Sequence, residues 1–565
     1  MTINDDDMKR VFLFVISLLG TLQISIVDHQ FSIGSAQACT NLIVGKKASA
    51  DGSVIVSYNA DSYGMYGNLY RHVGGMHAAG EMRKIYEWDT NKYLGEIPQA
   101  PVTYNVVGQM NEHQVSICET TFGGREELVD STGIIDYGSL IYIGLERSTT
   151  AREAIQIMTD LVAKYGYYSE GETFTIADKN EAWLMEMVGK GPGSKGAVWV
   201  AVRIPDDCIS AHANQSRITH FDMKDKQNVL YAKDVVKFAR SKGYFTGKKD
   251  AEFSFRDAFN PLDFGGIRYC DARAWSFLNK HSDGMDKYLP YICGTDSTLE
   301  MPLYVKPNHL LSVRDVQQSM RDHYEGTPLD MQQDLGSGPY NMPYRPSPLS
   351  FEVDGKKYYT ERPTSTQQTG FSFVGQMRAS LPDAIGGVVW WTNDDANMTA
   401  YTPIYCSVTA VPQCYERVEG VQDELNFSWE SAYWLCNTVS NIVYPYYSKM
   451  YPDLQAAQAE LETAFSQEQE RVEAEARMLY AGNTDKALAM LTDYSCHAAD
   501  RMMQRWDRLF KYLVVKHNDM VVKPEEDGQF KKTTYGLGAN PVRPSYPERF
   551  WKEVAKQTGT KYLMK

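Results

Sequence analysis

The amino-acid sequence predicts an α+β fold, a layered sandwich of antiparallel sheets flanked by helices and followed by a C-terminal helical region. Three observations predict it. Apolar and β-branched runs are joined by short polar turns, capped helix-like segments separate these runs, and beyond Asp453 the sequence changes to long stretches rich in Ala, Glu, Gln and Leu. Short turns favour antiparallel pairing, and helices beside sheets favour a layered arrangement.

The first expected strand is Thr40–Lys46, which leads through the turn-forming residues 50–53 into a second strand, Val54–Tyr58. The Asp-Gly pair in that turn is typical of a hairpin. Further strands are expected at Gln114–Phe122, Thr173–Ala177, Ala182–Val188, Ala197–Ile204, Cys208–His212 and Ile385–Thr392.

Helices are expected between and after these strands. Thr150 and Glu153 form a capping box that opens Ala151–Tyr165, and Ser312 opens another helix that runs to about Tyr324. The stretches Asp453–Tyr480 and Thr484–Lys516 predict a helical hairpin, with residues 481–483 as its turn. We therefore divide the chain into a leader (1–38), a sheet domain (39–450) and a helical region (451–565).

Charge and cysteine content exclude several function classes. The formal net charge of −14 disfavours binding to nucleic acid or to an anionic membrane surface. The nine cysteines include no C-x-x-C pair, which disfavours a zinc site, while the pairing of the cysteines other than Cys39 stays open. We expect neither a metal nor an organic cofactor.

The N-terminal segment has the features of a signal peptide. An apolar core, Val11–Val27, follows Lys9 and Arg10, and the small residues Ala36 and Ala38 form an A-x-A cleavage site. Cleavage after Ala38 makes Cys39 the first residue of the mature chain. We expect an exported protein, periplasmic or secreted, that does not stay in the membrane after the signal is removed.

A cysteine at a free N-terminus is a self-sufficient nucleophile. Its α-amine has an unperturbed pKa of roughly 7.7–8.0, so it can take the thiol proton near neutral pH. Two alternatives remain open. Cys39 is an incidental residue, or it is the acylation site of a lipid-anchored binding protein, although Ala36 stands where a lipoprotein signal has a large aliphatic residue.

Two other motifs carry weaker signals. Residues 191–196 match G-x-G-x-x-G, but a strand follows where a dinucleotide site requires a helix, so we expect a plain loop. His212 lies at the end of an expected strand, and a structural role is favoured over a catalytic one.

Several ordered segments resemble the dipeptidase A-type cysteine dipeptidases, which are N-terminal-nucleophile (Ntn) hydrolases related to penicillin V acylases and bile-salt hydrolases. The resemblance runs from Cys39 to about Cys406 and is weaker in the helical tail. The segments that carry it are residues 39–49, 51–53, 109–112, 119–121, 199–207, 211–218, 301–303, 312–316, 321–327 and 381–388.

The resemblance implies a four-layer αββα fold and hydrolysis of dipeptides or short peptides through a thioester on Cys39. It also implies that Asp61 holds the α-amine, that Asn214 donates to the oxyanion and that Arg273 is the cation near the thiolate. Many relatives have Arg where this chain has Tyr58, so the basic neighbour of the nucleophile is missing or comes from elsewhere. A related amidase that acts on N-acylated small molecules is the alternative, and a homo-oligomer is left open.

Glu119 is the candidate for substrate recognition. Strand periodicity places it on one face with Val115 and Ile117, so the carboxylate needs a partner. That partner is either an internal salt bridge or the α-ammonium of a substrate. In the second case, Thr120 or Thr121 is expected to donate near the scissile carbonyl, and Tyr58 to contact the substrate.

Overall fold

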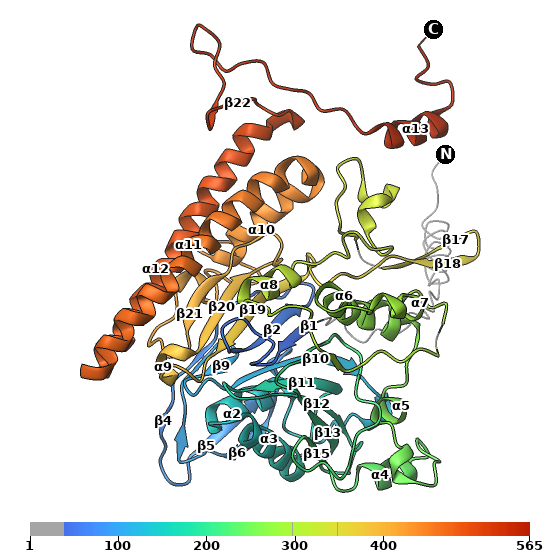
Figure 1. The fold of residues 1–565 in the computed structure, drawn as a ribbon, viewed down its shortest axis with the longest axis vertical. Helices are drawn as coiled ribbons and strands as arrows, with labels where there is room; N and C mark the ends of the chain where they lie inside the picture. The colour runs from blue at the N-terminus through green and yellow to red at the C-terminus, as the bar shows by residue number, and fades with distance from the viewer. Residues whose placement is uncertain (1–38, 297, 347–348, 565) are drawn as a thin grey trace, which may run out of the picture. The chain divides into compact units, whose positions relative to one another are not determined.

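The computed structural model describes residues 39–296, 298–346 and 349–564, and two large antiparallel sheets form the centre of this part of the chain (Figure 1). The expected leader, 1–38, lies outside the described residues. The first sheet has the order β16-β14-β1-β2-β19-β20-β21. Its strands are β1 (Thr40–Val44), β2 (Val54–Asp61), β14 (Ile209–His212), β16 (Tyr304–Val305), β19 (Thr369–Met377), β20 (Val388–Asn393) and β21 (Thr402–Tyr405).

The second sheet has the order β15-β13-β12-β11-β10-β9-β8-β3. Its strands are β3 (Arg71–His72), β8 (Val106–Val107), β9 (Met110–Asn111), β10 (Ser116–Gly123), β11 (Gly171–Ala177), β12 (Ala182–Gly189), β13 (Ala197–Ile204) and β15 (Val229–Tyr231). Four small hairpins accompany the sheets: β4 (Gly75–Met76) with β7 (Val102–Thr103), β5 (Met82–Tyr86) with β6 (Tyr93–Pro98), β17 (Ser350–Val353) with β18 (Lys356–Tyr359), and β22 (Glu525–Glu526) with β23 (Gln529–Phe530).

α-Helices accompany the two sheets. Those of the described residues are α2 (Tyr137–Arg147), α3 (Ala151–Tyr165), α4 (Val235–Ser241), α5 (Phe255–Phe259), α6 (Ala272–His281), α7 (Leu289–Ile292), α8 (Val313–Ser319), α9 (Asp383–Gly386), α10 (Ala432–Val443), α11 (Tyr447–Gly482), α12 (Thr484–His517) and α13 (Glu548–Thr558). In the part of the chain that is described, no helix has the length and apolar character needed to cross a membrane.

Strand alternation explains how one sheet serves two hydrophobic clusters. In β12, Trp183 and Met185 pack in a cluster with α2 and α3, whereas Leu184 and Val188 belong to a cluster that also contains Ile43 and Val56 of the first sheet. Successive strand residues point to opposite faces, so both faces of the second sheet are buried. Each such side chain stabilises the fold by about 1.5–3 kcal/mol when it is fully buried.

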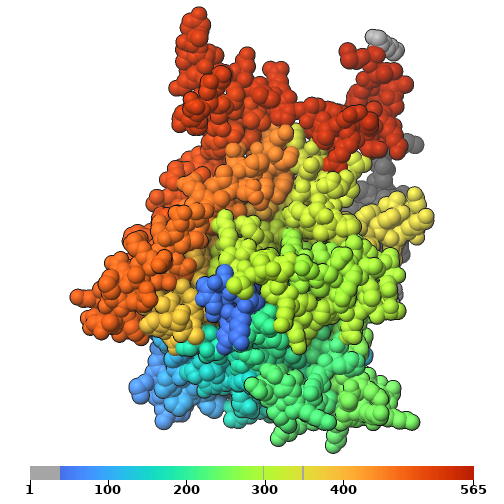
Figure 2. Space-filling model, in the orientation of Figure 1, coloured from blue at the N-terminus to red at the C-terminus, as the bar shows by residue number. Residues whose placement is uncertain are grey.

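The two strands that follow Cys39, β1 and β2, lie inside this core, but the turn between them does not. All residues of β1 and β2 are buried, while residues 47 and 50–52 of the connecting turn are exposed. Figure 2 shows dark-blue atoms of this first described segment at the surface, bordered by yellow-green atoms of residues near 300–330. The site is therefore built on rigid, fully paired strands.

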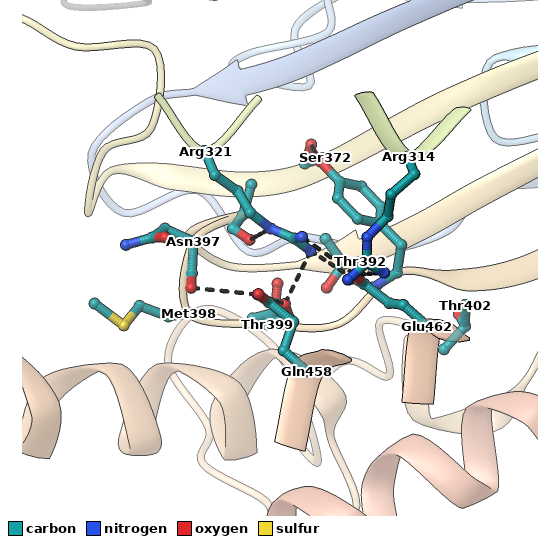
Figure 3. Close-up of polar contacts among 12 residues, drawn as sticks. Arg314, Arg321, Ser372, Thr392, Asn397, Met398, Thr399, Thr402, Gln458 and Glu462 are labelled. Atoms are coloured by element: carbon teal, nitrogen blue, oxygen red, sulfur yellow. Dashed lines mark hydrogen bonds and ion pairs between the residues drawn. The ribbon is translucent and has the colours of Figure 1, made fainter. Parts of the chain in front are cut away.

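The C-terminal helices are fixed to the sheets by buried ion pairs. Figure 3 shows Arg321 and Arg314 converging on Glu462 of α11, at 2.5 Å for each of the two closest contacts. Glu462 Oε1 also accepts from the backbone N–H of Tyr401, at 2.9 Å. A second pair joins Arg378 to Glu473 at 2.6 Å. The helical region is therefore part of the same packed structure as the sheets.

The α+β class, the antiparallel sheets and the C-terminal helical region are confirmed. The helix Ala151–Tyr165 and the strand Ala197–Ile204 match the expected bounds. Two expectations are wrong in part. Ile385 lies in α9, so that strand begins at Val388, and the helix opened by Ser312 ends at Ser319. Met320 is its C-cap, and beyond it the chain is irregular, with the Asp322 side chain accepting from the N–H of Tyr324, whose φ is +64°.

Candidate active site

Cys39 lies at the start of β1, which is paired on both sides, with β2 and with β14. The pairing of Thr40 with Asn59 puts residue 39 opposite residue 60. Asp61 therefore lies at the level of the amino side of Cys39. The cysteine is 3% exposed, and it and the other eight cysteines are free thiols in the structure.

The thiol is in contact with a phenol and a carboxyl group. Its Sγ lies 3.5 Å from the Tyr58 hydroxyl and 3.7 Å from Oε1 of Glu119. Burial raises the pKa of the Cys39 thiol well above its ordinary value, and the charges of Glu119 and Asp61 raise it further. Hydrogen bonds from Tyr58 and from the backbone of Asp61 act in the opposite direction. At neutral pH the thiol keeps its proton until a base removes it.

A pocket opens next to the thiol. Four of the residues expected at the site line it, namely Cys39, Tyr58, Asp61 and Glu119. Its other walls are mainly apolar or aromatic: Ala60, Met65, Trp88, Gln109, Tyr137, Gly138, Ile141, Tyr142 and Phe371. A concave apolar site with a few convergent polar groups is typical of a small-molecule binding site.

Asp61 ends β2 and is fully buried between two partners. Arg362 donates to its Oδ2 at 2.8 Å, and the hydroxyl of Thr369 donates to its Oδ1 at 2.6 Å. Burial raises the pKa of Asp61, although the charge of Arg362 and the bond from Thr369 oppose this shift. The side chain is held in one orientation beside the amino side of Cys39.

Arg273 holds the backbone at Cys39. It lies in the first turn of α6, directly after a π-helical turn at Gly266–Asp271. Its Nη1 donates at 2.7 Å both to the Cys39 carbonyl and to the Thr40 hydroxyl. Burial lowers the pKa of Arg273 to about 10, which still leaves the guanidinium charged at neutral pH.

Asn214 is held by the same arginine. Its Oδ1 accepts from Nη2 of Arg273 at 2.9 Å, and its Nδ2 donates to the carbonyl of Thr121 at 2.7 Å. This network fixes the orientation of the amide, with its oxygen toward the guanidinium. The φ of Asn214 is +55°, a conformation that Asn tolerates better than most residues.

Glu119 is 1% exposed, and its partner is a second acid rather than a base. Glu172, on the neighbouring strand β11, is its diagonal neighbour on the same face of the sheet, and the two carboxyl groups influence each other's pKa. The hydroxyl of Thr121 donates to Glu172 at 2.8 Å. Among the described residues, neither carboxyl forms an ion pair with a lysine, arginine or histidine. The salt bridge considered for Glu119 is thus absent from the described structure.

The threonines and His212 lie behind the pocket wall. His212 is buried, and its two ring nitrogens each lie 2.7 Å from a threonine hydroxyl, of Thr120 and of Thr175. Burial lowers the pKa of His212 to about 3, so the ring is neutral. The favoured structural role of His212 is therefore consistent with its contacts, and the Thr120 hydroxyl is engaged by that ring.

Sequence reasoning missed two residues of the site. Glu172 alternates with Phe174 and Ile176, the same signal that identified Glu119, but the expected strand began at Thr173, two residues after the start of β11, and so left Glu172 out. Arg362 lies in an irregular segment, outside helices and strands, where the sequence offers no periodicity to use.

Comparison with known proteins gives one family. Peptidase family C69 matches residues 38–460. A "Probable dipeptidase" of Latilactobacillus sakei is 26% identical, over 73% of this chain and 82% of that protein. A "Probable dipeptidase" of Salmonella dublin is 27% identical, over 70% of this chain and 85% of that protein. The "Dipeptidase A" of Lactobacillus helveticus is 24% identical, over 70% of this chain and 80% of that protein.

Proposed function

The chain belongs to peptidase family C69 and is a cysteine-type peptidase, and from this premise we propose that it is an exported dipeptidase whose nucleophile is Cys39. We further propose that its two sheets and flanking helices form the four-layer αββα sandwich of the Ntn hydrolases. Removal of residues 1–38 would then free the α-amine, and residues 451–565 would complete the catalytic domain, 39–450, as a helical appendage.

One observation carries the proposal: the Cys39 thiol lies in a pocket between two carboxyl side chains, Asp61 and Glu119. The thiol needs a base, because its surroundings hold it protonated. The α-amine of a mature Cys39 is the nearest one by covalent structure, and Asp61 is positioned at that side of the residue. A carboxylate there stabilises the ammonium that forms when the amine accepts the proton.

The reaction follows from these groups. The α-amine takes the thiol proton, and the sulfur attacks the carbonyl carbon of the peptide bond. The tetrahedral intermediate collapses with cleavage of the C–N bond, and the α-ammonium returns the proton to the leaving amine. Water then attacks the thioester with the amine again as base, which releases the acid product and restores the thiol.

Asn214 and Arg273 support the transition state. An amide oriented by a guanidinium is a preorganised donor for the developing oxyanion, and one such donor contributes about 3 kcal/mol. Arg273 also holds the Cys39 carbonyl, which limits the movement of the nucleophile. The chain's own residues supply each of these functions.

The test compares three forms of the chain on unblocked dipeptides: one beginning at Cys39, one retaining residues before it, and Cys39→Ser beginning at residue 39. We expect activity in the first form alone. Full activity of an uncleaved chain would rule out the α-amine as base. Intact mass of the chain exported from cells separates an unmodified N-terminal cysteine from an acylated one, which the lipid-anchor alternative requires.

The amidase alternative shares every catalytic residue, and the aromatic walls of the pocket can accept an acyl chain. The carboxyl of Glu119 at the pocket favours a substrate with a positive charge. Comparison of a free dipeptide with its N-acylated form decides between the two.

A further inference from the structure

Two buried carboxyl groups lie together beside the nucleophile, and their chemistry constrains what the pocket accepts. Glu119 and Glu172 are each 1% exposed, and they are diagonal neighbours on one face of the β10–β11 pair, since Glu119 pairs with Phe174 and Thr121 pairs with Glu172. Two carboxylates are both acceptors, so the two side chains can bond to each other only if one of them carries a proton. Among the described residues no donor reaches the buried Oε2 atom of either side chain, and a shared proton would supply that missing bond.

The donors around the pair decide where the proton lies. Glu119 Oε1 accepts from the Tyr58 hydroxyl at 2.5 Å and faces the Cys39 thiol, both of which favour its charged form. Glu172 receives a single hydroxyl, from Thr121. Burial and the charge of Glu119 raise the pKa of Glu172 well above its ordinary value, while that of Glu119 is raised mainly by burial.

The other titratable groups near the pair do not neutralise it. Asp89 acts on Glu119 and Glu170 acts on Glu172, and both are acids. The hydroxyl-bearing neighbours on α2 and on the segment before β11 are Tyr137 and Tyr167. In the described part of the chain, the pair therefore has donors around it but no paired cation.

We propose that Glu172 is a positioning residue that permanently carries a proton and donates it to Glu119, so that the pair presents a single negative charge to the α-ammonium of the substrate. This rests on the proposed dipeptidase function and specifies its substrate class as peptides with a free α-amine. One anion matches one ammonium, and the aromatic rings of Trp88 and Tyr137 on the pocket wall add cation–π attraction. An N-acylated substrate has no such charge.

The experiment compares Glu172→Gln with Glu172→Leu. A protonated glutamate and a glutamine are both neutral donors of similar shape, whereas leucine cannot donate. The readout is the ratio of kcat/KM for an unblocked dipeptide to that for its N-acetyl form. We expect Glu172→Gln to keep the ratio within about threefold of the parent, and Glu172→Leu and Glu119→Gln to lower it at least about tenfold.

The control is Glu186→Gln, a buried acid on β12 that accepts from the Ser216 hydroxyl and lies outside the pocket lining. It should leave the ratio unchanged, even if it lowers the midpoint of thermal unfolding. Equal losses in Glu172→Gln and Glu172→Leu would show that Glu172 must be charged and would overturn the proposal, as would an unchanged ratio in both.

A second readout keeps this test separate from the test of the proposed function. Calorimetry measures binding of the same two ligands to Cys39→Ala chains that carry each Glu172 variant. If the parent hydrolyses no dipeptide, the proposed function fails. The proposal about the Glu119–Glu172 pair is still supported if the chains bind the free dipeptide more tightly than its acetylated form and Glu172→Gln keeps this preference while Glu172→Leu loses it. Equal binding of the free and acetylated forms by the parent pair would overturn it.

Discussion

The phenolic hydroxyl of Tyr58 donates a 2.5 Å hydrogen bond to Oε1 of Glu119, and the Cys39 sulfur lies against both groups. Position 58, where the family resemblance leads one to expect an arginine, thus carries a phenol that contacts the Cys39 sulfur and an acid of the pocket. Arg273 supplies a positive charge from another side, through the Cys39 carbonyl. Position 58 itself therefore places no positive charge beside the Cys39 sulfur.

Tyr58→Phe removes that donor and leaves the ring in place. The hydroxyl has one proton, and when the thiolate forms it can turn that proton from Glu119 to the sulfur, a bond that lowers the pKa of the thiol. Its loss therefore raises that pKa further, and the rising limb of kcat/KM should move to higher pH. We expect kcat/KM on a free dipeptide to fall by about tenfold near neutral pH. The control is Tyr415→Phe, which loses a buried hydroxyl paired with Thr402, away from the pocket. An identical pH profile in Tyr58→Phe would exclude this role.

Asp61→Asn tests the carboxylate at the amino side of Cys39. The amide keeps the contact with Thr369 but loses the negative charge opposite Arg362. We expect kcat to fall by at least about 100-fold, since the ammonium that the proposed mechanism forms would lose its counter-ion. The pH dependence of the residual activity is the critical measurement. If that profile and kcat both match the parent, Asp61 has no part in the reaction.

Arg273→Lys tests positioning of the nucleophile. One ammonium cannot reproduce the forked contacts with the Cys39 carbonyl, the Thr40 hydroxyl and Asn214. We expect kcat to fall by about 10- to 100-fold with little change in KM, because the lost contacts act on the reacting groups. Arg378→Lys is the control: it loses the two hydrogen bonds from one guanidinium to Glu473 and should lower the free energy of unfolding without changing kcat. A rise in KM alone would contradict the assignment.

The sequence predicted the parts of the site that lie on regular strands. Strand periodicity identified β1, β2 and the buried acid Glu119, because alternation depends on local residues alone. It missed β19, the strand that pairs with β2 and carries Thr369, and it missed Arg362 in an irregular segment. The partners of Asp61 come from residues about 300 positions away, as the separations of 301 and 308 residues show. Such pairings depend on tertiary packing, which one sequence does not specify.

The two arginines on Glu462 should contribute unequally to stability. Arg321 is 3% exposed and Glu462 1%, whereas Arg314 is 34% exposed. Arg321→Met leaves a buried carboxylate without the arginine that contacts both of its oxygens, and it should lower the free energy of unfolding by about 3–5 kcal/mol. Arg314→Met removes a partly exposed ion pair and should lower the free energy of unfolding by at most about 1 kcal/mol. Chemical denaturation measures the free energy of unfolding of each variant. Equal decreases in the two variants would contradict the expected dependence on burial.

The last prediction concerns Asp394, which joins the end of β20 to α10. It accepts from Asn437 at 2.8 Å and from the Ser440 hydroxyl at 2.5 Å, and burial raises its pKa to about 7. The unfolded chain has the ordinary Asp pKa of about 3.9. Between these values the folded state holds a proton that the unfolded state has released, so the stabilisation is complete at low pH and is lost as pH rises through about 7. Three pKa units correspond to about 4 kcal/mol as an upper bound.

Asp394→Asn removes this titration and keeps the backbone, because Asn tolerates the φ of +65° at this position. We expect the parent to lose stability relative to the variant as pH rises from about 4.5 to 8. Urea denaturation of both proteins across this range measures the difference in their unfolding free energies. The control is Asp423→Asn. Hydrogen bonds, led by the Leu425 backbone N–H, lower the pKa of Asp423 to about 2, so it stays charged over the whole range and the variant should differ from the parent by a constant amount. A difference that is also constant for Asp394→Asn would mean that Asp394 is ionised in the folded protein, in which case Asn437 and Ser440 stabilise a buried charge instead of a neutral acid.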